Sequence, residues 1–206
     1  MPDWAGYAGK PVDEIGVKRL EHMDELIQSI LQQTHYSNTF IDLILGNLKE
    51  DAELSTEHYK QHDINTVVNN CLSHYPFSYD EGLWVNWEPQ QSFEFLGDDI
   101  LMTNVLNNLI KNSLYFIKAA QKGEIYLRTE RGTEINTLYF RDTAKGASPE
   151  ILSHLFQSFY SKRYGGTGLG LAFCKKIMRS FGGDITVESV EGEYMQFTLC
   201  FPRIKD

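Results

Sequence analysis

Apolar residues in the first quarter of the chain recur at the three- and four-residue spacing of a helix. They begin after Asp13 and share one stripe with the polar residues Thr34 and Ser37; the apolar positions are Leu20, Met23, Ile27, Ile30, Ile41, Ile44 and Leu48. The pattern predicts a long amphipathic helix, which cannot bury its stripe alone. We therefore expect it to pair with a second copy in a homodimer. The alternative is packing on the chain's own later domain.

A polar and charged segment over residues 50–61 follows this stripe and is typical of a linker. Beyond it the pattern changes to shorter segments of mixed helical and alternating character. We therefore divide the chain into a helical segment with its linker over 1–58 and a globular domain over 59–206.

Helical and alternating patterns predict the elements of the globular domain. The predicted helices span 64–74 with Asp63 as cap, 98–120, a short segment opened by Ser148-Pro149-Glu150, and 171–181. The predicted strands span 83–87, 92–95, 124–130, 135–141, 184–190 and 194–201, and the last four form two hairpins.

Charge and cysteine content exclude several function classes. The formal net charge of −9 argues against nonspecific binding to nucleic acid or to an anionic membrane surface. The longest apolar runs fall far short of the roughly 20 residues that span a bilayer. Cys71, Cys174 and Cys200 are scattered without metal-ligand spacing, so we interpret them as buried reduced thiols of a cytosolic protein.

Alternating glycines at Gly166, Gly168 and Gly170 precede the last predicted helix. Backbone without Cβ atoms approaches an anion closely, and a helix start presents unpaired N–H groups to it. The stretch predicts a phosphate cradle, although a plain tight turn has the same pattern. Lys162 and Arg163, just before it, lie where they could reach bound phosphates.

Two further sets of polar residues stand out. Asn104, Asn108 and Asn112 recur every four residues and line one side of the 98–120 helix, as ligands or as solvated surface. Asp142 follows a strand directly and starts a turn that ends at Gly146, either as part of a site or as a turn residue.

In this order, the asparagine-lined helix, the strand ending in Asp142, the aromatic pair Phe156 and Phe159, and the glycine loop resemble the four nucleotide-binding boxes of the sensor histidine kinase ATPase domain, in the GHKL superfamily. The resemblance covers roughly 63–202. It implies an α+β fold, a two-layer α/β sandwich of the Bergerat type, preceded by a long dimerising helix that is part of a helical hairpin.

The resemblance also implies roles for individual residues. Asn112 would ligate Mg²⁺, the Asp142 carboxylate would accept from the adenine amine, and the glycine loop would hold the phosphates. Asn108, Asn112, Lys162 and Arg163 would be the catalytic residues. The residues assigned to ATP are Asn108, Asn112, Tyr115, Asp142, Gly146, Phe156, Phe159, Gly166, Thr167, Gly168, Leu169, Gly170, Leu171 and Thr198.

This sequence departs from the family pattern in several places. Ala144 replaces the middle glycine of the Asp142 turn, Tyr115 replaces a basic residue, and the lid over 161–165 is short. Neither His22 nor His35 is followed by the acidic residue and proline of a phosphoacceptor box. We therefore expect the acceptor histidine to lie outside this sequence.

The expected function is transfer of the γ-phosphate of ATP to a histidine, for relay to the receiver domain of a response regulator. Related ATPases that hydrolyse ATP carry a Glu where this chain has Asn108, so transfer is favoured over hydrolysis. The alternatives are a serine-directed kinase of the anti-sigma type and a non-catalytic nucleotide-binding dimeric scaffold. We expect a cytoplasmic protein that meets the membrane only through segments outside this sequence.

Overall fold

The computed structural model describes residue 23 and residues 56–78, 80–162 and 166–204. The chain divides into two units, Met1–Leu48 and Lys49–Asp206, and the fold and the site belong to the second. Of the predicted N-terminal helix the structure describes only Met23, which is helical and 56% exposed. The rest of that helix and its dimer contact lie outside the described residues, as do His22, His35 and Arg163. The boundary at residue 58 stays a prediction.

A mixed five-stranded sheet forms one layer of the second unit, in the order β2-β4-β5-β7-β6. Its strands are β2 Val85–Trp87, β4 Ile125–Glu130, β5 Ile135–Asp142, β6 Asp184–Val190 and β7 Tyr194–Pro202. β2 runs parallel to β4, and the other neighbours are antiparallel. Both predicted hairpins, β4–β5 and β6–β7, are confirmed, and the pairing of β5 with β7 joins them at the centre of the sheet.

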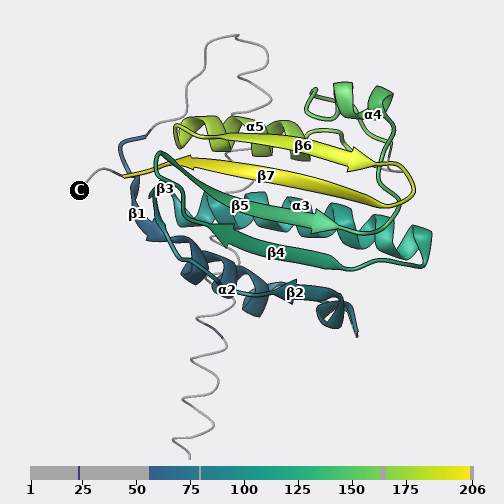
Figure 1. The fold of residues 1–206 in the computed structure, drawn as a ribbon, viewed down its shortest axis with the longest axis horizontal. Coiled ribbons are helices and arrows are strands. Elements are labelled where there is room, and N and C mark those ends of the chain that lie inside the picture. Colours follow the sequence, from purple (N-terminus) through teal and green to yellow (C-terminus); the bar gives the residue numbers. More distant parts are fainter. Residues whose placement is uncertain (1–22, 24–55, 79, 163–165, 205–206) are drawn as a thin grey trace, which may run out of the picture. The chain divides into compact units, whose positions relative to one another are not determined.

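Helices form the second layer, and Figure 1 shows α3 and α5 together on one face of the sheet. The helices are α2 Ile64–His74, α3 Asp99–Ala120, α4 Pro149–His154 and α5 Gly170–Ser180. The predicted helix starts are confirmed by their caps: Asp63 accepts a hydrogen bond from the Thr66 amide at 2.8 Å, and Asp98 accepts one from the Leu101 amide at 2.9 Å.

Two of the predicted short segments are only partly correct. In 83–87 the strand is limited to β2, because a 3₁₀ turn over Glu81–Trp84 precedes it. In 92–95 the strand is β3, Glu94–Gly97, which pairs antiparallel with β1, Lys60–Asp63, in a separate two-stranded sheet. The linker prediction over 50–61 is therefore wrong at its end. β1 consists of polar residues, and only its long-range pairing with β3 makes it a strand.

An aromatic cluster attaches this two-stranded sheet to the main domain. Phe95 of β3 is 1% exposed and lies with its ring centroid 5.2 Å from Phe201 of β7 and 5.6 Å from Phe181 at the end of α5. Phe93 adds a further contact with Phe201 at 5.4 Å. Tilted aromatic pairs at these distances contribute beyond their buried area, so β3, α5 and β7 are held as one body.

The aromatic cluster predicts a large loss of stability when its central ring is removed. We expect Phe95→Ala to lower the free energy of unfolding by about 3–5 kcal/mol, because it leaves a cavity among packed rings. Leu83→Ala is the matched control, since Leu83 is 78% exposed and should change stability by no more than about 0.5 kcal/mol. Urea unfolding followed by circular dichroism measures both, and equal midpoints for the two variants would contradict the prediction.

Candidate functional site

The glycine loop packs its backbone against the aromatic segment that precedes it. Gly168 has a φ of +70°, and a Cβ there would lie 2.5 Å from the carbonyl carbon of Phe159 and 2.6 Å from the amide nitrogen of Tyr160. Both the left-handed backbone and the close approach require glycine. The third and fourth predicted boxes, the aromatic segment and the glycine loop, are therefore in direct contact at this point.

Gly170 begins α5 and faces the asparagine-lined helix. A Cβ at Gly170 would lie 2.8 Å from Oδ1 of Asn108. Leu169 caps α5 without any side-chain hydrogen bond to its first turn. The N–H groups of a first helical turn have no partner within the helix and point toward the loop, where they favour an anion. Gly168 and Gly170 thus let neighbouring parts of the chain pack closely around the first turn of α5, whose N–H groups are available to an anion.

Asn108 is oriented by its own helix. Its Nδ2 donates to the backbone carbonyl of Asn104 at 3.0 Å, which directs Oδ1 toward the glycine loop. Asn104 is 6% exposed, and its Nδ2 has no hydrogen-bond partner within the described part of the chain. Asn112 and Tyr115 lie one and two turns further along α3 and are half-buried. The asparagine row is thus not a solvated face.

Asp142 ends β5 as a buried carboxylate, 4% exposed. Oδ2 accepts a hydrogen bond from the Ser113 hydroxyl of α3 at 2.8 Å, and Oδ1 accepts a longer one from the Ala144 amide at 3.3 Å. Burial raises the pKa of Asp142, and the two hydrogen bonds oppose that rise only in part. The carboxylate is held in an apolar surrounding with acceptor capacity to spare.

The turn that follows Asp142 is fixed by its neighbours. Gly146 has a φ of +57°, and a Cβ there would lie 2.1 Å from the Val190 carbonyl oxygen. The Thr143 amide donates to the Glu124 carbonyl at 3.0 Å. Ala144 is fully buried and its φ is not positive. The turn therefore accommodates the Cβ of Ala144 without backbone strain.

The aromatic segment before the glycine loop divides into a packed and an exposed part. The Phe156 ring lies 6.4 Å from the Phe197 ring of β7. Phe159 is 67% exposed and adopts a φ of +66°, which is unusual for a residue with a side chain. Lys162 is exposed beside the Tyr160 ring. The backbone of Gly168 packs against the backbone of Phe159 at this unusual conformation.

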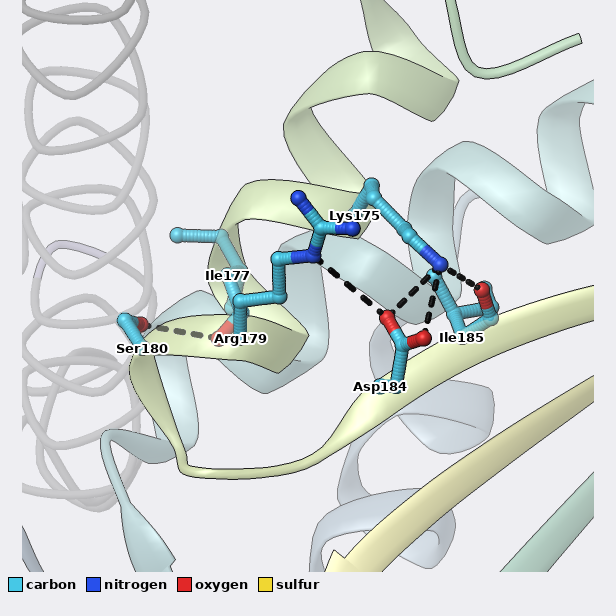
Figure 2. A network of polar contacts seen from close by, with 6 residues as sticks. All are labelled: Lys175, Ile177, Arg179, Ser180, Asp184 and Ile185. Atoms are coloured by element: carbon cyan, nitrogen blue, oxygen red, sulfur yellow. Dashed lines mark hydrogen bonds and ion pairs between the residues drawn. The ribbon is translucent and has the colours of Figure 1, made fainter.

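A polar network ties the second half of α5 to β6, as Figure 2 shows. Lys175 Nζ lies 2.7 Å from Asp184 Oδ1 and 2.7 Å from the Ile185 carbonyl oxygen, and Arg179 Nε lies 3.7 Å from Asp184. Burial would raise the pKa of Asp184, but its hydrogen bonds and nearby cations hold the pKa below its usual value. Lys175 Nζ also lies 5.2 Å from the centroid of the Phe156 ring. Lys175 thus links the helix behind the glycine loop to the aromatic segment.

Thr198 is the assigned residue that the structure separates from the others. It pairs with Tyr139, while its neighbour Phe197 pairs with the buried Phe140. Since strand side chains alternate between faces, Thr198 lies on the face of the sheet opposite to Asp142. Met195 pairs directly with Asp142 and shares its face. The register thus places Thr198 away from Asp142 and Met195 beside it.

Three residues of this region had no role assigned from the sequence: Ser113, Lys175 and Met195. Ser113 carried a usable signal, because it is a polar residue within the apolar stripe of α3. Lys175 and Met195 carried none, since their positions depend on pairing and packing between distant segments.

The remaining assigned residues surround the two centres described above. Gly166, Leu171 and Phe156 are half-buried, Leu169 is buried, and Thr167 is exposed. α3 connects the centres, because Asn108 faces the glycine loop while Ser113 contacts Asp142. Among the described residues, no helix combines the length and apolar character needed to cross a membrane.

Comparison with known sequences gives a consistent family. The autoinducer sensor kinase/phosphatase CqsS of Vibrio cholerae is 31% identical over 204 residues, which are 98% of this chain and 29% of that protein. The autoinducer sensor kinase/phosphatase LuxN of Vibrio campbellii is 35% identical over 167 residues, which are 79% of this chain and 19% of that protein. The chain thus spans less than a third of the length of these relatives.

Solved structures share the fold. The Acinetobacter baumannii histidine kinase AdeS aligns with a TM-score of 0.60 and 21% identity, over 89% of this chain and 84% of that chain. Full-length ShkA in complex with AMPPNP aligns with a TM-score of 0.64 and 18% identity, over 87% of this chain and 40% of that chain. The predicted two-layer α/β sandwich is confirmed. Residues 97–205, more than half of the chain, match the family model itself, and the chain belongs to the histidine kinase-, DNA gyrase B- and HSP90-like ATPase family.

Proposed function

We propose that this chain binds Mg-ATP and transfers its γ-phosphoryl group to a histidine, as the catalytic part of a two-component sensor histidine kinase. One observation carries the proposal: α3 places Asn108 at the glycine loop and Ser113 at the buried Asp142. A phosphate cradle and a buried acceptor for a base amine, both in contact with one helix, suit the two ends of a nucleotide. The family and its sensor kinase relatives support the same function.

Each centre would meet a different part of the nucleotide. The Asp142 carboxylate accepts from the adenine amine, and Gly146 shapes the turn around it. The N–H groups at the start of α5 face the phosphates, with Gly166 to Gly170 allowing their close approach. Asn112 would hold Mg²⁺ through its amide oxygen, a ligand type that this ion accepts, and the bound ion would neutralise phosphate charge.

The chemistry favours transfer over hydrolysis. Asn108 occupies the place of a general base in related hydrolysing ATPases, and an amide cannot remove a proton from water. Phosphoryl transfer depends on positioning and charge neutralisation, which Asn108, Lys162 and Arg163 supply together with the loop amides. The acceptor histidine comes from outside this sequence, and an aspartate of a response-regulator receiver domain takes the phosphoryl group next.

The cellular location and the oligomeric state of the chain are part of the same proposal. We propose a cytoplasmic domain, where ATP is available, that acts as a homodimer through the predicted helix between residues 13 and 48. Contact with a membrane would come only through segments outside this sequence.

Phosphoryl transfer can be tested with γ-labelled ATP. We expect the chain, mixed with a histidine-bearing dimerisation hairpin from a relative, to produce labelled protein that loses its phosphate in acid and keeps it in alkali, as phosphohistidine does. Label that survives acid would contradict histidine transfer and favour a serine-directed kinase. Binding of Mg-ADP without any label would favour a non-catalytic nucleotide-binding scaffold.

Asp142→Asn tests the base site. We expect the variant to bind Mg-ADP about 10- to 100-fold more weakly, because it loses a charge-assisted hydrogen bond. Burial raises the pKa of Asp142. The contribution of this carboxyl group to the stability of the fold is therefore lost as the pH rises through that pKa. Because Asn is uncharged, the variant should keep its fold at neutral pH. Asp99→Asn, at an exposed position of α3, is the control. Isothermal titration calorimetry measures both, and unchanged affinity in Asp142→Asn would make Asp142 a turn residue only.

Gly168→Ala tests the phosphate cradle. The backbone at Gly168 is left-handed, a conformation that costs a residue with a Cβ about 1–2 kcal/mol. The added Cβ would also push the loop away from Phe159 and Tyr160. We expect a lower melting temperature and a smaller thermal shift with Mg-ADP. Gly82→Ala is the control, since the nearest atom to its Cβ is 3.8 Å away. A wild-type ADP shift in Gly168→Ala would show that the loop does not hold phosphate.

A further inference from the structure

Ser113 places a hydroxyl group inside the apolar stripe of α3. The side chain is 1% exposed and is surrounded along the helix by Leu109, Ile110, Leu114 and Ile117, which are all buried. A serine within a helix often donates to the carbonyl one turn earlier. Ser113 instead donates across to Oδ2 of Asp142, which belongs to β5, at 2.8 Å.

This bond makes the two oxygens of the Asp142 carboxylate unequal. Oδ2 receives the short bond from Ser113, while Oδ1 receives only the 3.3 Å contact from the Ala144 amide. The carboxylate is therefore fixed in rotation, and Oδ1 keeps more of its acceptor capacity. Both side chains are buried, with Asp142 at 4% exposure, and a hydrogen bond in such surroundings is stronger than one in water.

Purine bases differ in what they offer to such a carboxylate. Adenine presents one amine donor next to a ring nitrogen that accepts. Guanine presents a ring N–H and an amine side by side, and these two donors match both oxygens of a symmetric carboxylate. A carboxylate with one oxygen already engaged suits the single donor of adenine better, because the second guanine donor would lose its partner.

We propose that Ser113 is a specificity-determining positioning residue, which engages Oδ2 of Asp142 and thereby favours adenine over guanine nucleotides. This inference rests on the proposed function, since it requires Asp142 to face the base. Ser113 acts through Asp142 and need not touch the nucleotide itself.

The bond has a second consequence, which a purely structural serine would not have. Burial raises the pKa of Asp142, and the Ser113 hydroxyl and the Ala144 amide oppose that rise. Lys145 is the charged residue of the turn that follows Asp142. Its Nζ lies 4.9 Å from the centroid of the Phe116 ring of α3. Without the Ser113 hydroxyl the pKa of Asp142 rises further. Because the adenine amine needs an ionised acceptor, ADP affinity should then begin to fall at a higher pH as the solution is acidified.

Binding of Mg-ADP and Mg-GDP to the folded chain, by calorimetry over a range of pH, tests the proposal. We expect Ser113→Ala to reduce the preference for ADP over GDP by about fivefold or more, the equivalent of one ordinary hydrogen bond. We also expect the pH midpoint of ADP binding to move upward. Ser180→Ala is the matched control: Ser180, at the end of α5, donates to the Ile177 carbonyl, and its removal should change neither quantity.

Each result bears on one proposal or on both. A wild-type preference and pH midpoint in Ser113→Ala, with ADP still bound, would overturn the role of Ser113 and leave the proposed function standing. Failure of the wild-type chain to bind either nucleotide would overturn both. If Ser113→Ala does not fold, Ser113→Cys keeps a side chain of similar size with a weak donor, and the same loss of preference is expected from it.

Discussion

Burial of the apolar face of α3 against the five-stranded sheet is the constraint on which the site depends. That face includes Leu109 and Ile110, which have no exposed surface. Once it is buried, the rotation of the helix about its axis is fixed. The fixed rotation directs Asn108 toward the start of α5 and Ser113 toward the end of β5. Two centres that come from distant parts of the sequence are thereby set by one packing interaction.

The glycines of the loop act by letting other parts of the chain approach. Gly168 admits the backbone of the aromatic segment, and Gly170 admits the amide of Asn108. Lys175 holds the helix behind them to β6 and contacts the Phe156 ring. The loop is therefore supported from the aromatic segment, from α3 and from the sheet, which is the preorganisation that a phosphate site needs.

Burial and hydrogen bonding work against each other at Asp142. Removal from water raises its pKa, while Ser113 and the Ala144 amide favour the charged form. A buried carboxylate that is only partly satisfied by hydrogen bonds lowers the stability of the fold. Such groups cluster at functional sites. The backbone at Ala144, in the turn that follows, has no positive φ. This position therefore does not require the glycine of the family pattern.

Much of the fold could be predicted from the sequence because its signals are local. Period-two alternation located β4 to β7, the cap at Asp63 located the start of α2, and apolar periodicity located α3. The alternation of Leu138, Phe140 and Asp142 also places the carboxylate on the buried face. The asparagine, aspartate, aromatic and glycine segments, in this order, resemble the nucleotide-binding boxes of the family, and that resemblance predicted the nucleotide site.

The tertiary structure decided what depends on partners distant in sequence. β1 became a strand only through its pairing with β3, and register placed Met195 rather than Thr198 beside Asp142. The contact between Ser113 and Asp142 required the packing of α3 on β5. Periodicity determines which face of an element is buried, whereas the residues that meet across that face are set by register and packing between elements.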